Sequence, residues 1–171
     1  LFSIGCATKN VEYSAVKQEG QWETKAQIKN FKDNTTKTLS MDVMAIKDRA
    51  LRIEVSGTLG IQVASLLMKK ENITILVHPQ KRALIGIADD KSLEAVIKTP
   101  IHPQWLYGAF FDSALDGWDC EGDPIASCKS PNGEVIKWTD RDGEKKRITI
   151  ECPEYTMQIL VKNYQTKVQS P

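Results

Sequence analysis

Period-two alternation of apolar and polar residues is the feature that most constrains this fold. Between residues 22 and 87, apolar residues occupy every second position in successive short segments, and polar turn-forming runs such as residues 32–34 and 47–49 separate these segments. Such alternation is typical of half-buried β-strands. Strands that follow one another so closely connect as hairpins, so the sequence predicts an antiparallel meander over this part of the chain.

Two helical segments interrupt the strands. Asp89 and Asp90 are expected to cap a first helix, which ends near Thr99 before Pro100. One face of that helix carries the apolar residues at helical spacing, namely Leu93, Val96 and Ile97. Residues 104–111, behind Pro103, form a second helix that is apolar nearly all round and must therefore be buried.

The alternation returns in the last third of the chain. Strands are predicted over residues 134–139, 146–152 and 155–164, whereas residues 112–130 carry no pattern that assigns them. Residues 63–68 and 83–87 are apolar on both faces, so a second layer must cover them. The predicted fold class is mostly β with an α insertion (α+β), in which a curved antiparallel sheet is covered by a short helical lid.

Length and composition limit the classes of protein that fit. A chain of 171 residues is sufficient for one domain with its own core, and 41% hydrophobic and 26% charged residues are ordinary for such a domain. A net charge of +1 gives no indication of nucleic-acid binding. No catalytic motif was found, and His78 and His102, each followed by proline, are interpreted as boundary residues. We therefore predict no enzymatic activity, no cofactor and no metal site.

The beginning of the sequence resembles the end of a secretory signal that precedes a lipidated cysteine. Residues 1–5 are apolar and small before Cys6, and hydrophilic residues follow it. Ser3 departs from the branched aliphatic residue usual at that place, and an incidental apolar terminus is the alternative. We expect Cys6 to be lipidated, residues 1–18 to be a signal remnant and tether, and residues 19–171 to form a single domain.

Three cysteines remain if Cys6 carries lipid. Cys120 and Cys128 bracket a turn-forming run and are predicted to pair, with Cys128 and Cys152 as the other possible pair. None of them has the short paired spacing of a zinc site.

Residues 51–64 (LRIEVSGTLGIQVA), followed by an apolar strand, a hairpin, Gly86 and the helices, resemble the LolA/LolB superfamily, in particular the LolB-type outer-membrane lipoprotein receptors. In order of elements, the resemblance covers about residues 20–165. It implies a half-open antiparallel barrel whose concave apolar face binds the acyl chains of lipoproteins. It also implies a protruding loop, residues 57–60, with Leu59 at the tip to contact the outer membrane, although Thr58 stands where the family commonly has proline. A partly buried hairpin residue is the alternative reading of Leu59.

The expected lipid-binding positions are the inward faces of the strands together with the aromatic and aliphatic residues of the second helix. They are Met41, Val43, Ile53, Val55, Val63, Leu67, Ile75, Ile85, Trp105, Leu106 and Phe110. Aromatic residues at helical spacing more often belong to a simple core than to a ligand site. Parity alone also does not identify which face of a strand is concave.

Three functions remain on the sequence, the third being a secreted small-lipid binder or enzyme. The first is a non-catalytic, lipid-anchored envelope protein that accepts or delivers lipoproteins at the periplasmic side of the bacterial outer membrane. Its partners would be acyl chains of lipoproteins or other lipids, the outer membrane, and a periplasmic LolA-like carrier. The alternative is an envelope lipoprotein that uses the same fold, with a packed core, as a protein-interaction module. Whether the space between the sheet and the helices is open or filled distinguishes the first function from this alternative.

Overall fold

The computed structural model describes residues 18–166, and their dominant feature is one eleven-stranded antiparallel sheet. Its strands are β1 Glu19–Asn30, β2 Thr35–Ile46, β3 Ala50–Ser56, β4 Gln62–Lys69, β5 Asn72–Val77, β6 Arg82–Ile87, β7 Asp119–Glu121, β8 Ser127–Lys129, β9 Val135–Asp142, β10 Lys145–Glu151 and β11 Tyr155–Gln165. Their order across the sheet is β6-β5-β4-β3-β2-β1-β11-β10-β9-β8-β7. The predicted mostly-β class and antiparallel meander are confirmed.

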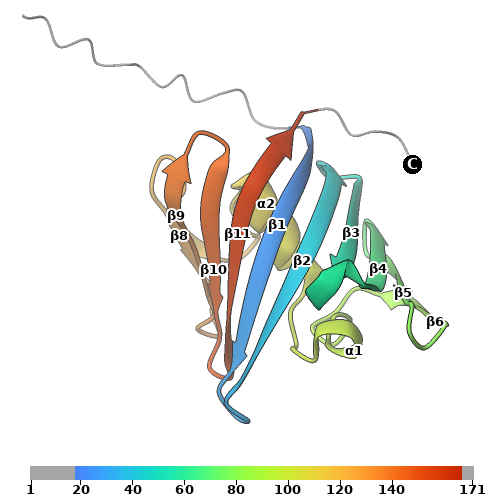
Figure 1. Ribbon diagram of the computed structural model, residues 1–171. Helices are drawn as coiled ribbons and strands as arrows, with labels where there is room; N and C mark the ends of the chain where they lie inside the picture. The colour runs from blue at the N-terminus through green and yellow to red at the C-terminus, as the bar shows by residue number, and fades with distance from the viewer. Residues whose placement is uncertain (1–17, 167–171) are drawn as a thin grey trace, which may run out of the picture.

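The pairing of β1 with β11 joins the two ends of the chain in the middle of the sheet. Ala26 lies opposite Ile159 in this pair, and the register shifts once, between Glu23 and Thr24. The sheet does not close, because β6 and β7 each have a neighbour on one side only. Figure 1 shows it curving around α2 as an open, barrel-like layer.

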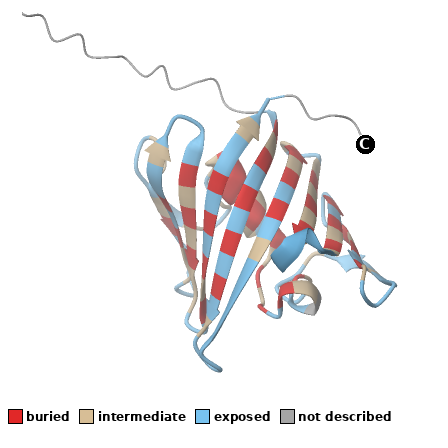
Figure 2. Cartoon of the chain, viewed as in Figure 1, coloured by how far each residue is buried: buried red, intermediate tan, exposed pale blue. Residues whose placement is uncertain are grey.

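The concave face of this sheet carries the core. Along β2, for example, Met41, Val43 and Ala45 are buried, while Asp42 between them is exposed. Figure 2 shows the same alternation of buried and exposed residues along neighbouring strands. The apolar residues of alternate positions therefore face one common interior, as the period-two pattern predicts.

The two helices, α1 Glu94–Ile97 and α2 Pro103–Phe111, lie on the concave side. The second agrees with the prediction: Pro103 is its first residue, and the His102 Nδ1 accepts a hydrogen bond from the backbone N–H of Gln104 at 3.2 Å. The first is only four residues long. The predicted cap by Asp89 and Asp90 is wrong, because the residue that precedes α1 is Leu93.

The Asp89 carboxylate instead accepts from the Ser92 hydroxyl at 2.8 Å and from the Lys91 N–H at 3.0 Å. These bonds close a turn between β6 and α1. An aspartate that bonds backbone two residues ahead favours such a turn as much as a helix start, so the sequence signal was ambiguous.

The segment that the sequence left unassigned contains β7 and β8. Each has three residues, too few for a period-two pattern to be recognised. Cys120 and Cys128 lie directly opposite each other in this pair and form a disulfide, whereas Cys152 is free. The bond links the edge strand β7 to the rest of the sheet.

Candidate functional site

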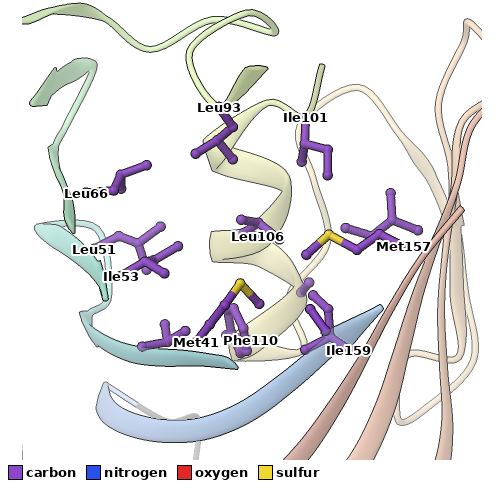
Figure 3. Packing of buried hydrophobic residues seen from close by; sticks show 14 of the residues in the cluster. Met41, Leu51, Ile53, Leu66, Leu93, Ile101, Leu106, Phe110, Met157 and Ile159 are labelled. Atoms are coloured by element: carbon purple, nitrogen blue, oxygen red, sulfur yellow. The ribbon is translucent and has the colours of Figure 1, made fainter. Parts of the chain in front are cut away.

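The candidate site lies between the concave face of the sheet and the two helices. In Figure 3, Met41, Leu51 and Ile53 of the sheet point toward Leu106 and Phe110 of α2. All five side chains are buried. How firmly each helix is attached to the sheet decides whether this space can open.

Hydrogen bonds fix the carboxyl end of α2. The Lys146 ammonium on β10 donates to the carbonyl of Phe110 at 3.0 Å and to the Asp112 carboxylate at 2.6 Å. The Trp138 Nε1 on β9 donates to the carbonyl of Ala109 at 2.8 Å. Carbonyl groups at a helix end have no partner within the helix, so these bonds satisfy groups that burial would otherwise leave unpaired.

Side chains in the middle of α2 attach it to the other half of the sheet. The Tyr107 hydroxyl donates to the carbonyl of Ile46 at 3.1 Å and accepts a hydrogen bond from the N–H of Asp48. The ring of Trp22 on β1 packs on Phe110, with 5.5 Å between centroids. The second helix is therefore a fixed part of the fold.

The first helix is attached differently. Leu93 and Ile97 are buried and Val96 is half-buried against the core. Among the described side chains of α1, those of Glu94, Val96 and Ile97, none makes a hydrogen bond to the sheet. The following chain is fixed again where the Tyr155 hydroxyl donates to the carbonyl of Pro100 at 2.9 Å. Apolar contacts therefore hold the residues of α1 itself, while the preceding Ser92 donates one long hydrogen bond to the carbonyl of Ile87 on β6 at 3.5 Å.

A small apolar cavity of about 20 Å³ lies directly beneath α1. Its lining residues are Met41, Ile53, Val55, Ala64, Leu66, Leu93, Val96, Ile97, Leu106 and Met157. This is about the space of one water molecule, so side chains fill the centre of the site in this conformation. Four of the predicted lipid-binding residues line it: Met41, Ile53, Val55 and Leu106.

A second cavity, of about 700 Å³, opens to solvent beside the amino-terminal half of α2. It is lined by Lys47, Asp48, Arg49, Ala50, Leu51, Met68, Lys70, Glu71, His102, Gln104, Trp105, Tyr107, Gly108, Ser113, Ala114, Leu115, Asp116 and Trp118. Trp105 and Trp118 meet edge to face, with 5.4 Å between centroids. The volume lies within the range of about 300–1,000 Å³ of small-molecule pockets.

The two cavities follow each other along the concave face of β3 and β4. Leu51 lines the large cavity, and Ile53, two positions further along β3, lines the small one. On β4, Met68 and Leu66 are related in the same way. Residues two apart in a strand share a face and lie about 7 Å apart. A narrow apolar wall therefore separates the open cavity from the filled one.

The other predicted lipid-binding residues lie outside the small cavity, and four of them still face the interior. Trp105 lines the open cavity. Of the predicted lipid-binding residues, those that are buried in the core but line neither cavity are Val43, Ile75 and Phe110.

Three predicted positions do not face this site. Leu67 and Ile85 alternate with buried or inward neighbours and lie on the convex face, where both are exposed. Val63 lies at a register shift between β3 and β4, against Gly57. Because β4 and β6 are apolar on both faces, parity could not distinguish their concave side.

Leu59 is fully outside the core. Its side chain is 92% exposed at the tip of the 3₁₀ turn Thr58–Gly60 between β3 and β4. Its backbone is left-handed, with φ of 70°, a conformation that is unfavourable for a branched apolar residue. The alternative reading of Leu59 as a partly buried hairpin residue is wrong. Its predicted contact with a membrane stays a prediction.

Further predictions concern cysteines and chemistry. Cys6 lies outside the described residues. Burial raises the pKa of the Cys152 thiol to about 11, so this thiol is protonated at neutral pH. Among residues 18–166, no group of His, Cys, Asp or Glu side chains is arranged to hold a metal ion, and no helix is long and apolar enough to cross a membrane.

Sequence reasoning missed two components of the site. Lys146 was placed on a strand, but its role at the end of α2 was not foreseen. Its position two and four residues before Ile148 and Ile150, on their buried face, was a signal for a buried cation. Trp118, in the unassigned segment, carried no pattern that linked it to α2.

Comparisons with known proteins give a match of fold without a match of sequence. No family model and no curated protein matches the chain. A LolA superfamily protein from Nitrosomonas europaea is similar in structure, with a TM-score of 0.58 and 8% identity, over 90% of this chain and 88% of that one.

Two further solved structures share the fold. One, described as an outer membrane lipoprotein-sorting protein domain from Vibrio parahaemolyticus, has a TM-score of 0.53 and 6% identity over 86% of this chain and 84% of that one. The other, a DUF1329 family protein from Desulfovibrio piger, has a TM-score of 0.53 and 11% identity over 91% and 88%. At such identities the likeness concerns architecture alone, and at that level the resemblance seen in the sequence is confirmed: this chain has the fold of the LolA/LolB superfamily.

Proposed function

We propose that this protein is a non-catalytic, acyl-chain-binding lipoprotein of the bacterial envelope that accepts or delivers lipoproteins at the outer membrane. The observation that carries the proposal is that the open cavity and the small apolar cavity beneath α1 follow each other along the same face of β3 and β4, separated only by a narrow apolar wall. The fold shared with a LolA superfamily protein and with a lipoprotein-sorting domain supports the same class of cargo.

An acyl chain needs apolar surface and no specific polar partner. Each buried methylene contributes about 0.8 kcal/mol, so a segment of a few methylenes is held firmly. In the proposed binding mode the chain enters the 700 Å³ cavity between Trp105 and the strand ends, then runs along β3 and β4 past Leu51 and Ile53. The polar part of the cargo stays at the solvent-exposed side of this cavity, whose lining includes Lys47, Arg49 and Lys70.

The filled centre of the site requires one element to move when cargo enters. The first helix is that element, because α2 is hydrogen-bonded to β2, β9 and β10, whereas α1 rests on apolar side chains. Displacing Leu93 and Ile97 would expose an apolar surface that an acyl chain can cover in their place. Affinity for cargo is then reduced by the fraction of time that α1 spends closed.

Leu93→Ala tests this gate directly. Removing part of the side chain that holds α1 closed should raise the affinity for an acylated peptide about tenfold, because the open form becomes more populated. The measurement is the Kd for a synthetic acylated peptide, by native mass spectrometry or fluorescence, with the unacylated peptide as the reference ligand.

Glu94→Ala is the matched control, since Glu94 is exposed on the same helix and should leave the affinity unchanged. If Leu93→Ala only lowers the melting temperature and the acylated peptide binds neither variant, the core is packed and the carrier proposal is wrong. That result would favour the second candidate function, a protein-interaction module, which the 20 Å³ size of the central cavity supports.

The proposed location at the outer membrane rests on Cys6. If this residue is lipidated, Cys6→Ala should transfer the protein from the membrane to the soluble fraction, because acyl chains supply the anchoring energy. Fractionation of cells that produce the two forms measures this. A Cys6→Ala protein that remains with the membrane would show that another feature anchors it.

A further inference from the structure

The edge strand β6 is unusual for a soluble protein. Proteins protect edge strands with charges, proline or bulges, because unpaired backbone groups can pair with another chain. The interior of β6, residues 83–87 (ALIGI), contains none of these. Figure 1 shows β6 as the outermost strand at its end of the sheet, with no segment beyond it.

The backbone groups of β6 that face away from β5 can be identified. The Ala88 N–H donates to the carbonyl of Glu71, and the His78 N–H donates to the carbonyl of Val63. Since bonded pairs alternate in an antiparallel ladder, the even-numbered residues of β6 bond β5. Ala83 and Ile85 therefore direct their N–H and C=O groups to the open edge. Ile87 directs its N–H there as well, whereas its carbonyl accepts a long hydrogen bond from the Ser92 hydroxyl at 3.5 Å.

The side chains of these three residues also lack cover. They alternate with the inward-facing Leu84 and so lie on the convex face, where Ile85 is 82% exposed and Ile87 is 70% exposed. The neighbouring Leu76 on β5, opposite Ala83, is 43% exposed. Open hydrogen-bonding groups thus coincide with an apolar strip, the combination that strand addition uses.

We infer that β6 pairs antiparallel with β6 of a second copy of this chain, around a twofold axis through Ile85. Only this register gives every outward-facing residue a partner: Ile85 faces Ile85 of the other copy, and Ala83 faces its Ile87. The contact is self-complementary, as a twofold interface requires. It joins the two sheets and extends the apolar strip across the axis.

The charges at the two ends of β6 also fit a second copy of this chain as the partner. Lys81 and Arg82 precede the apolar segment, and Asp89 and Asp90 follow it; all four are exposed. In the antiparallel register, Lys81 lies opposite Asp89 of the second copy. The twofold axis repeats this pair at the other end of the interface. An anionic membrane surface would be attracted by the basic end and repelled by the acidic one, whereas a second copy matches both.

The first test is the mass of the protein in solution, measured by light scattering across micromolar concentrations. The wild type should be a dimer, and Ile85→Lys should be a monomer because two like charges would meet at the axis. Leu160→Lys is the matched control, since Leu160 is an exposed apolar residue on β11 in the middle of the sheet, and it should remain a dimer.

Disulfide trapping tests the register in a background with Cys6→Ala and Cys152→Ser. Ile85→Cys should cross-link two copies, because bonded partners lie about 5.5 Å apart between Cα atoms, within disulfide reach. Ile87→Cys should not, since two copies of residue 87 are four positions apart along the strand, about 13 Å.

A monomeric wild type at every concentration overturns the inference, as does a dimer that Ile85→Lys leaves intact. Equal cross-linking by Ile85→Cys and Ile87→Cys overturns the register. If the wild type is a monomer that binds vesicles, and Ile85→Lys abolishes this binding, the apolar strip contacts a membrane instead of a second copy. None of these outcomes depends on acyl-chain binding, so the carrier proposal stands or falls separately.

Discussion

Lys146→Met should lower the free energy of unfolding by about 3–5 kcal/mol, the cost of breaking a buried ion pair by removing one partner. Lys146 is only 5% exposed, and its ammonium donates to Asp112 and to two carbonyls at the end of α2. Methionine keeps most of the aliphatic volume but leaves these acceptors without the cation. For a chain of this length the melting temperature should fall by about 6–20 °C.

Lys145→Met provides the matched control, because Lys145 precedes Lys146 on β10 and is exposed. Exposed substitutions change stability by about 0.5 kcal/mol or less, so its melting temperature should stay near that of the wild type. Combining Lys146→Met with Asp112→Asn should recover part of the loss, since the unpaired carboxylate is removed and asparagine tolerates the left-handed backbone of residue 112. If Lys146→Met and Lys145→Met have the same melting temperature, the ion pair does not hold α2.

The sheet was largely predictable from the sequence because its strands are long and one face of each is buried. In β1, β2 and β11 the buried residues alternate with intermediate or exposed ones, so the strands and the apolar face of each follow from the period-two pattern. The eight-residue spacing of Cys120 and Cys128 around a turn also indicated their pairing, although the three-residue strands that carry them gave no periodic signal.

The site was only partly predictable, for two physical reasons. Apolar residues on both faces of β4 and β6 conceal which face is concave, so Leu67 and Ile85 were placed on the wrong side. A cavity also depends on how side chains from distant segments fill space. Lys47, Lys70 and Trp118 converge on the open cavity from two hairpins and from the loop after α2, and no local pattern links them.

The two helices are attached to the sheet by different kinds of contact, which their sequences alone do not show. Both are apolar, yet α2 is attached through Tyr107, Trp138 and Lys146, and α1 through Leu93 and Ile97. If the protein is the proposed carrier, loss of cargo binding through damage to α2 should therefore accompany unfolding. Changes in α1 should alter binding with less effect on the rest of the fold, because elements held by few contacts open locally.

Leu59→Asn should distinguish a role of Leu59 in membrane contact from a role in the stability of the fold. Leu59 is 92% exposed and its φ is 70°, so neither burial nor backbone preference favours leucine there. Asparagine adopts this backbone more readily, and the variant should be as stable as the wild type or more stable by up to about 1 kcal/mol. If Leu59 inserts into the outer membrane, the same variant loses an apolar contact of about 1.5–3 kcal/mol, and vesicle binding should fall about tenfold or more.

Leu59→Glu should lose vesicle binding to a similar or greater extent, again without a fall in melting temperature, because the glutamate remains in solvent when the protein is folded. Leu160→Glu is the control for a charge placed on an exposed apolar position away from this tip. The measurements are thermal unfolding, binding to vesicles of outer-membrane phospholipid, and transfer of an acylated peptide to them. Normal binding and transfer by stable Leu59 variants would exclude this residue as the membrane contact. An exposed leucine held in an unfavourable backbone is best explained by a partner that covers it, and the three measurements determine whether that partner is the lipid surface.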